Sequence, residues 1–152
     1  METSRAMTMS EVHDVALSRL RSSDQRYTTN RRALVETLAA AEAPLTIAGV
    51  LESRQGLAQS SAYRNLVVLE EAGVVHRIVT SADHARFELT EAVTGAHHHH
   101  LVCTECGLVL DMTLPDNVED ELHHALDAVA ALAAFSGEHH RIDLLGRCTD
   151  CS

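Results

Sequence analysis

Residues 97–106 read HHHHLVCTEC, and a second cysteine pair follows in CTDC at 148–151. Each Cys-x-x-Cys segment turns two thiolates toward one point, and two such segments complete the tetrahedral sulfur site that Zn²⁺ prefers. Free cysteines or one redox pair would leave the duplication unexplained. We therefore predict a closed structural zinc site, with the ligands Cys103, Cys106, Cys148 and Cys151.

The four histidines before the first cysteine pair are expected to lie on a strand. Alternation along a strand places His97 and His99 on one face and His98 and His100 on the other. The alternative is a solvated polar turn, but His-rich tracts are a recognised metal signature. One strand could thus supply two metal sites, each of which needs further ligands.

The segment after the first cysteine pair can complete one of these sites. Residues 117–135 predict an amphipathic helix, and Glu119 borders its apolar stripe. A strand beginning at His139 or His140 is expected next. The predicted buried stripe is Val118, Leu122, Ala125, Leu126 and Val129. The predicted additional site is His97, His99, Glu119 and His140, with His139 or His123 as replacements for His140.

The N-terminal half predicts three helices and a hairpin. Helical spacing of apolar residues marks 28–42, 45–53 and 59–73, and β-rich runs follow within 74–90. This is the winged helix-turn-helix pattern, in which the third helix enters the DNA major groove. Ser60 is expected to cap that helix and to leave polar side chains near its exposed start. The candidate DNA-binding residues are Ser60, Ser61, Tyr63, Arg64, Asn65 and Arg31.

The hairpin register suggests a second metal site. A turn centred on Ala82 pairs His76 with Glu88, and cross-strand partners lie about 5 Å apart at Cβ. Such a pair could share a cation, although an ordinary surface pair is the simpler alternative. If His98 and His100 face this hairpin, a bound metal would join the two halves of the chain.

Charge divides the chain in the same way. The 152 residues carry a net charge of −10, which argues against a simple basic nucleic-acid binder. Residues 96–152 hold most of it, however, while 1–95 are close to neutral and contain an arginine cluster between Arg19 and Arg32. The sequence lacks a signal-peptide pattern and a membrane-length apolar run. We expect a soluble cytoplasmic protein with no membrane partner and no small-molecule substrate.

Taken in order, TTNRRALVETL, SSAYRNLVVLEEAGVVHR, RFELT, HHHHLVCTECGLVLDM and GRCTDC resemble the ferric uptake regulator family of metal-dependent bacterial repressors. The resemblance covers nearly the whole chain. It implies an α+β fold with a winged-helix DNA-binding domain at 1–91, a hinge at 92–96 and a small α/β dimerisation domain at 97–152. It also implies a homodimer that binds a palindromic double-stranded operator when loaded with metal.

The resemblance assigns ligands by position. The cysteines match the structural zinc site, and Tyr63 with Arg64 matches the recognition helix. The implied regulatory site is His76, Glu88, His98 and His100, and the implied additional site is the His97, His99, Glu119 and His140 set.

The branch of the family depends on two features. His76 falls where zinc-sensing members place a regulatory ligand, and the segment EAPLT at 42–46 lacks the histidine of iron-type members. Both features favour the zinc uptake regulator branch. A regulatory site of nitrogen and oxygen ligands alone could nevertheless hold Zn²⁺, Fe²⁺ or Mn²⁺.

Two other functions remain open at this stage. Iron in the regulatory site could make the protein a peroxide sensor. A zinc hydrolase is the alternative of a different class, since His/Glu sites can activate water. Against it, the sequence contains no His-Glu-x-x-His motif.

Overall fold

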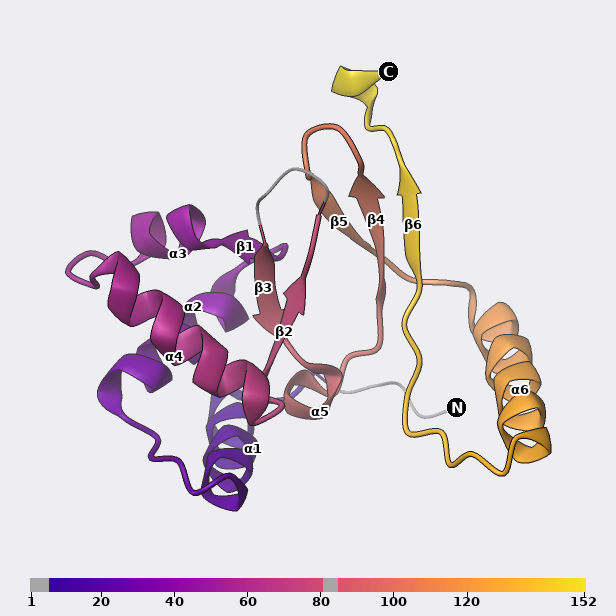
Figure 1. Ribbon diagram of the computed structural model, residues 1–152, viewed down its shortest axis with the longest axis horizontal. Helices are drawn as coiled ribbons and strands as arrows, with labels where there is room; N and C mark the ends of the chain where they lie inside the picture. The colour runs from indigo at the N-terminus through magenta and orange to yellow at the C-terminus, as the bar shows by residue number, and fades with distance from the viewer. Residues whose placement is uncertain (1–5, 81–84) are drawn as a thin grey trace.

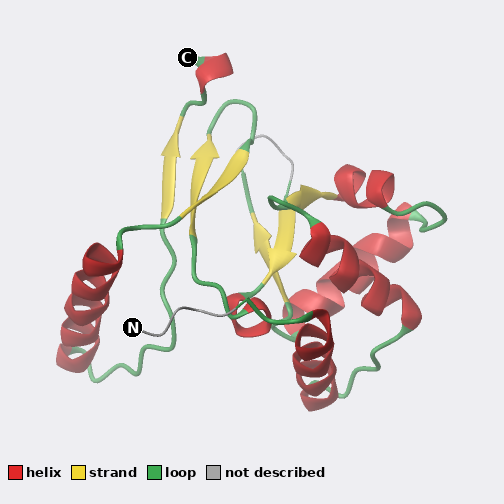
Figure 2. Ribbon diagram, turned by 180° about the vertical axis from the view of Figure 1, so that it is seen from behind, coloured by secondary structure: helices red, strands yellow, loops and turns green. Residues whose placement is uncertain are grey.

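The computed structural model describes residues 6–80 and 85–152. Two three-stranded sheets lie next to each other, with the helices of residues 9–71 on one side and the long helix Asp116–Leu132 on the other (Figures 1 and 2). We call residues 6–94 the N-terminal unit and residues 97–152 the C-terminal unit. The strands of each unit form a sheet of their own, and helices accompany both sheets, so the α+β class predicted from the sequence is confirmed.

Five helices build the N-terminal unit: α1 (Met9–Ser22), α2 (Thr29–Ala40), α3 (Ile47–Ser53), α4 (Gln59–Glu71) and α5 (Glu91–Thr94). Side-chain oxygens of Thr28 and Thr46 accept hydrogen bonds from the first turns of α2 and α3 and so begin those helices. The three predicted helices are present. The cap predicted for α4 is wrong, because its N-cap is Ala58 and Ser60 lies within the first turn.

Aliphatic side chains make the core of the N-terminal unit. Leu20, Leu34, Leu66 and Leu69 come from α1, α2 and α4, and Phe87 from the sheet covers them. All five are at most 1% exposed. Burying one such side chain contributes about 1.5–3 kcal/mol, so the scarcity of aromatics does not prevent a stable core.

The wing is formed by β2 (Val75–Ile78) and β3 (Arg86–Leu89). They pair antiparallel with His76 opposite Glu88, which confirms the predicted register. The predicted turn at Ala82 lies outside the described residues. A short strand that was not predicted, β1 (Leu45–Thr46), pairs with the other edge of β3.

The predicted hinge contains helix α5. Val93 on this helix is fully buried in the N-terminal core, so α5 is attached to the N-terminal unit. Gly95 ends the helix with φ of 71°, a left-handed conformation that glycine adopts without strain. The domain boundaries drawn from the sequence stay a prediction.

The C-terminal unit places β4 (His99–Cys103) between β5 (Val109–Met112) and β6 (Asp143–Gly146). β5 pairs with β4 antiparallel and β6 pairs with it parallel. A short 3-10 helix, Thr149–Cys151, follows β6. The strand predicted to begin at His139 or His140 therefore begins later, at Asp143.

The long helix α6 (Asp116–Leu132) stands away from both sheets in Figure 1. Among the described residues, none on α6 is buried, so the predicted burial of its apolar stripe is wrong for the single chain. Val118 is 40% exposed and Val129 64% exposed. The helix is amphipathic as predicted, but the described residues of one chain leave most of its apolar stripe exposed.

A small apolar cluster and one arginine contribute to the contact between the two units. Ile78 on β2 packs with Val102 and Val109 of the C-terminal sheet. Arg86 on β3 donates hydrogen bonds to the carbonyl of Gly107 at 2.8 Å and to that of Pro44 at 3.3 Å. In residues 6–80 and 85–152, no helix has the length and apolar character needed to span a bilayer.

Candidate metal centres

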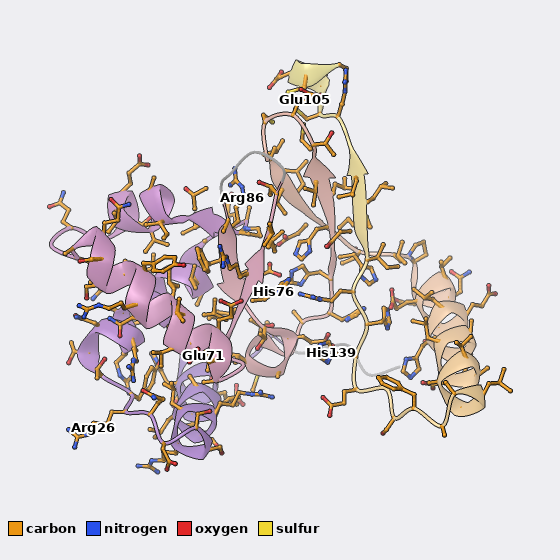
Figure 3. All side chains as sticks on the ribbon, viewed as in Figure 1. Arg26, Glu71, His76, Arg86, Glu105 and His139 are labelled. Atoms are coloured by element: carbon orange, nitrogen blue, oxygen red, sulfur yellow. The ribbon has the colours of Figure 1, made fainter. Side chains whose placement is uncertain are left out.

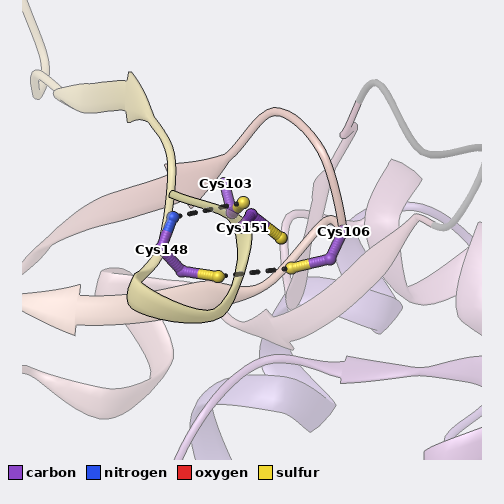
Figure 4. A group of neighbouring side chains, drawn as sticks. All are labelled: Cys103, Cys106, Cys148 and Cys151. Atoms are coloured by element: carbon purple, nitrogen blue, oxygen red, sulfur yellow. Dashed lines mark hydrogen bonds between the residues drawn. The ribbon is translucent and has the colours of Figure 1, made fainter.

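The four cysteines meet at the far end of the C-terminal sheet (Figure 4). Their sulfur atoms all lie within 4.8 Å of one another, and the Sγ atoms of Cys106 and Cys148 are 3.7 Å apart. Four sulfurs at about 2.3 Å from a tetrahedral zinc ion are separated by about 3.8 Å. The cysteines are free thiols rather than disulfides, and their spacing fits Zn²⁺.

Local backbone geometry brings the cysteine pairs together. Gly107, with φ of 74°, closes the turn after Cys106, and Thr104 N–H donates to Gly146 O at 2.8 Å. Backbone N–H groups of Cys106 and Cys148 lower the pKa of the Cys103 thiol to about 6. A thiol of this acidity is largely thiolate at neutral pH, which is the form that binds metal.

A second cluster surrounds Glu119 on α6. Its oxygens lie 3.0 Å from His97 Nε2, 3.0 Å from His99 Nε2 and 2.6 Å from His140 Nε2. Three imidazoles around one carboxylate form a donor set suited to Zn²⁺ or Fe²⁺. The structure thus brings together all four residues predicted for the additional site. His123 lies at the edge, with its ring centroid 6.4 Å from that of His140.

A third cluster spans the two units. Glu88 on β3 lies 3.0 Å from His98 Nε2 and 2.9 Å from His100 Nε2, and Asp111 Oδ1 lies 3.9 Å from both nitrogens. The ligand atoms of these four residues fall within 4.8 Å of one another. Its donors come from the wing and from two strands of the C-terminal sheet.

The two imidazoles of the third cluster differ in their hydrogen bonds, because His98 Nε2 bonds to Glu88 Oε2 at 3.0 Å and His100 Nε2 does not. Within the described part of the chain, His100 Nε2 is buried and makes no hydrogen bond, although Glu88 Oε1 is 2.9 Å away. Its Nδ1 lies 3.2 Å from Asp143 Oδ1. A carboxylate on Nδ1 keeps the proton there and leaves the Nε2 lone pair for a metal. The arrangement fits a divalent cation.

The third cluster differs from the predicted regulatory site at one position. His76 lies outside it, with its ring centroid 6.4 Å from that of His100, and Arg141 Nη1 lies 2.6 Å from His76 Nδ1. Figure 3 shows His76 at the boundary between the units. Asp111 takes the fourth place instead. A hairpin closed by the cysteine turn pairs His100 with Asp111, so this ligand could have been found from the sequence.

Without a metal, hydrogen bonds and opposite charges stabilise the residues of the third cluster next to one another. Burial opposes ionisation of Glu88, but contacts with His100 and His98 outweigh it and hold the pKa of Glu88 at about 2. The hydrogen bond to Glu88 raises the pKa of His98 to about 9. Burial, and then the charge of Arg141, lower the pKa of His76. At neutral pH His98 therefore carries a proton that a bound cation would have to displace.

The predicted DNA-binding residues lie at the start of α4. Ser60, Tyr63 and Arg64 are exposed, whereas Asn65 accepts a 3.0 Å hydrogen bond from Arg31 Nε and donates to Ser61 O. Arg31 is thereby attached to α4 and held beside its first turns. These positions leave Tyr63 and Arg64 free of the core and directed outward.

Comparisons with known proteins agree with this architecture. The model of the ferric uptake regulator family matches residues 22–144. The peroxide operon regulator of Bacillus subtilis (strain 168) is 29% identical over 145 residues, which cover 90% of this chain and 91% of that protein. The ferric uptake regulation protein of Legionella pneumophila is 33% identical over 102 residues, covering 67% of this chain and 69% of that protein.

Solved structures share the fold. The ferric uptake regulator of Helicobacter pylori, described as having three functional metal binding sites, has a TM-score of 0.70 at 19% identity, covering 97% of this chain and 95% of its own. The Pseudomonas aeruginosa regulator with manganese has a TM-score of 0.68 at 24% identity, covering 89% and 98%. These proteins are regulators, which removes the support for a hydrolase. Because the family model spans most of its length, this chain belongs to the ferric uptake regulator family.

Proposed function

We propose that this chain is a metal-dependent transcriptional repressor that binds operator DNA as a homodimer when its third cluster holds a divalent cation. One observation carries the proposal. Glu88 belongs to the wing, whereas His98, His100 and Asp111 belong to the C-terminal unit, and all four meet within 4.8 Å. These residues can act as a set only when the two units stand in this arrangement.

The proposed mechanism is a shift of population. An arrangement that moves β3 away from β4 separates Glu88 from His98 and His100, and so leaves an incomplete donor set. A cation bound by all four residues therefore favours the closed arrangement by its difference in affinity for the two states. In the dimer, the closed arrangement would fix the separation of the two α4 helices, which must match major grooves about 34 Å apart.

The homodimer is supported by the uncovered apolar surface of the C-terminal unit. Val129 on α6 is 64% exposed and Leu132 91% exposed, and on β6 Leu144 is 60% exposed. Apolar surface of this kind on a small unit is typical of a protein interface. We propose that a second copy of this chain covers it.

DNA recognition is supported by the start of α4. Tyr63 and Arg64 are exposed there, and Arg31 is held alongside by Asn65. Arginine and tyrosine side chains on a helix that enters the major groove can contact base edges and phosphates.

The donor set supports a proposal for the sensed metal. The zinc-sensing interpretation relied on His76 and on the lack of a histidine in EAPLT at 42–46, and here Arg141 lies against His76 while Asp111 enters the cluster. The cluster offers two imidazoles and two carboxylates, whereas the set with His76 would offer three imidazoles and one carboxylate. The additional carboxylate makes the cluster the better site for Fe²⁺ or Mn²⁺. We propose Fe²⁺ or Mn²⁺ as the sensed metal. Zinc sensing is the alternative, and it requires His76 to leave Arg141.

Operator binding measured in parallel against buffered Zn²⁺, Fe²⁺ and Mn²⁺ tests both the metal dependence of repression and the identity of the sensed metal. The protein is used with its cysteine site loaded, and fluorescence anisotropy reports binding to a palindromic DNA. Stimulation by Fe²⁺ or Mn²⁺ supports the proposed metal, and stimulation by Zn²⁺ alone supports the alternative. Operator binding that no metal changes contradicts metal-dependent repression.

Peroxide sensing is a second candidate, favoured by the likeness to the peroxide operon regulator over 90% of the chain. Iron held by His98 and His100 would let peroxide oxidise one of these imidazoles and so destroy the site. Mass spectrometry of iron-loaded protein after peroxide treatment tests this candidate. An added oxygen atom on His98 or His100 supports it, and unmodified histidines contradict it.

A further inference from the structure

His97 is held at both ring nitrogens by carboxylates from different units. Its Nε2 lies 3.0 Å from Glu119 Oε1 in the second cluster, and its Nδ1 lies 2.7 Å from Glu91 Oε2. Glu91 is outside the group of four that could hold an ion. It nevertheless makes the shortest contact of His97.

The two contacts impose a definite chemical form on the imidazole. A neutral histidine has one N–H and one lone pair on its two ring nitrogens. Both carboxylates only accept, so without a metal each contact needs an N–H on His97. When a cation replaces the Nε2 proton, Glu91 keeps the proton on Nδ1 and leaves the Nε2 lone pair to the metal. A carboxylate on the outer nitrogen also makes the inner nitrogen a stronger donor to a metal.

His99, in the same cluster, lacks this preparation. Ile142 N–H donates to His99 Nδ1 at 3.2 Å, so the proton of His99 is on Nε2 and faces Glu119. His99 must therefore move its proton to Nδ1 and lose the contact with Ile142 N–H before it can bind a cation through Nε2. His97 keeps its Nδ1–H contact with Glu91 when a cation replaces the Nε2 proton.

Glu91 connects this chemistry to the N-terminal unit. It is the first residue of α5, and Val93, two residues later, is fully buried in the core that α1 and α4 share. The hydrogen bond from Gly95 N–H to Glu91 O, at 2.7 Å, closes the helix. The contacts of His97 with Glu91 and Glu119 thus connect α5 to α6 beside the short segment that joins the units.

We propose that Glu91 is a positioning residue for the second cluster: it orients His97 for metal binding and ties occupancy of that cluster to the placement of α5. This inference rests on the proposed binding of a cation by His97, His99, Glu119 and His140. It extends that proposal, because it gives the second cluster its own connection to the DNA-binding unit. A plain surface ion pair between Glu91 and His97 would contribute little to folding and nothing to metal affinity.

Zinc titration of the full-length protein, with its cysteine site loaded, tests the role in affinity. Glu119→Ala first identifies the binding step that belongs to the second cluster. Glu91→Ala is then expected to weaken that step by about 10–100-fold, as loss of an outer carboxylate does at other metal sites. Glu91→Gln keeps a side-chain oxygen that accepts from Nδ1 and is expected to restore part of the loss. Glu138→Ala removes a carboxylate that lines the same cleft between the units and serves as the matched control.

The outcomes separate the inference from the function on which it rests. If Glu119→Ala removes no zinc step, the second cluster does not bind zinc, and both the occupancy and the role of Glu91 are contradicted. If the step exists and Glu91→Ala binds as tightly as Glu138→Ala, only the inference is overturned. A lower melting temperature of metal-free Glu91→Ala with unchanged affinity likewise shows a merely structural contact and overturns it.

Hydrogen exchange at α5 tests the connection between the units. Zinc loading of the wild type is expected to slow exchange of the Gly95 N–H that bonds to Glu91 O. In Glu91→Ala saturated with zinc, this slowing should be lost while Glu138→Ala retains it. Equal slowing in both variants would mean that occupancy reaches α5 without Glu91, which contradicts the inference.

Discussion

Glu88 and His100 meet across the boundary between the two units, with Oε1 and Nε2 2.9 Å apart. Glu88 stands on a strand of the wing, and His100 on the central strand of the C-terminal sheet. His100 Nε2 is buried without a hydrogen bond in the described part of the chain. Two donors aimed at one point from separate units are what a metal-operated clamp requires.

Replacing the wing ligand tests this clamp from the N-terminal side. Glu88→Gln keeps the side-chain size and removes the charge that a cation needs. Outer-shell substitutions cost roughly 10–100-fold in metal affinity, so loss of a direct ligand should cost at least as much. Calorimetric titration measures the change, with Glu70→Gln, from the same cleft, as the control. Equal affinities for the two variants would exclude Glu88 as a ligand.

Metal binding to the third cluster should depend steeply on pH. The hydrogen bond to Glu88 raises the pKa of His98 to about 9, so a cation must displace a proton at neutral pH. Apparent affinity should rise roughly tenfold per pH unit for each displaced proton up to about pH 9. The same raised pKa stabilises the metal-free fold fully below the ordinary value of 6.5, and this contribution is lost as the pH rises through about 9. Affinity that stays constant between those limits would contradict this competition.

Arg86 should stabilise the contact between the wing and the first cysteine turn. Its guanidinium donates to Gly107 O and Pro44 O, and it stands at the unit boundary in Figure 3. Hydrogen bonds from charged groups contribute about 1.5–3 kcal/mol, so Arg86→Ala should lower the free energy of unfolding by about that amount. Arg147→Ala removes only an exposed pair with Glu105 and should cost less than about 1 kcal/mol. Urea unfolding compares the two variants, and equal losses would refute a special role for Arg86.

Removing the cysteine site should unfold the end of the C-terminal sheet. Cys148→Ser takes away one of four sulfur ligands, and structural zinc sites supply folding free energy directly. The variant should purify with less than one equivalent of zinc at this site and should lose the melting transition of the C-terminal unit. Zinc content and circular dichroism on heating give the readout. Ser152→Ala, a neighbouring change, should retain both, and a zinc-replete, stable Cys148→Ser would contradict the assignment.

Local spacing predicted much of the site. The two cysteine pairs, the alternation of His97 to His100 between two clusters and the pairing of His76 with Glu88 all follow from short-range rules, and each is present in the structure. The four histidines were expected on one strand, but β4 begins at His99, so His97 and His98 precede it. Glu91 was missed because its role depends on how distant segments pack, whereas Asp111 follows from the hairpin that pairs it with His100 and could have been predicted. Burial of the α6 stripe was predicted wrongly because the apolar pattern does not say whether the covering surface belongs to the same chain.

Helix α1 was missed although local signals for it exist. Thr8 and Glu11 form a capping box, and Val12, Ala16 and Leu20 recur at the spacing of one buried helical face. The arginines at its end drew attention to charge instead. Here the sequence carried enough information, and the helix could have been predicted.

Operator binding by the His98→Ala/His100→Ala double variant tests the central claim most directly. Fluorescence anisotropy is followed while the metal that stimulates the wild type is added, with the cysteine site loaded throughout. His124→Ala, an exposed position on α6, is the matched control. Metal should increase operator affinity for the wild type and for the control, and leave the His98→Ala/His100→Ala variant unstimulated but folded. Undiminished metal stimulation of that variant would contradict the account.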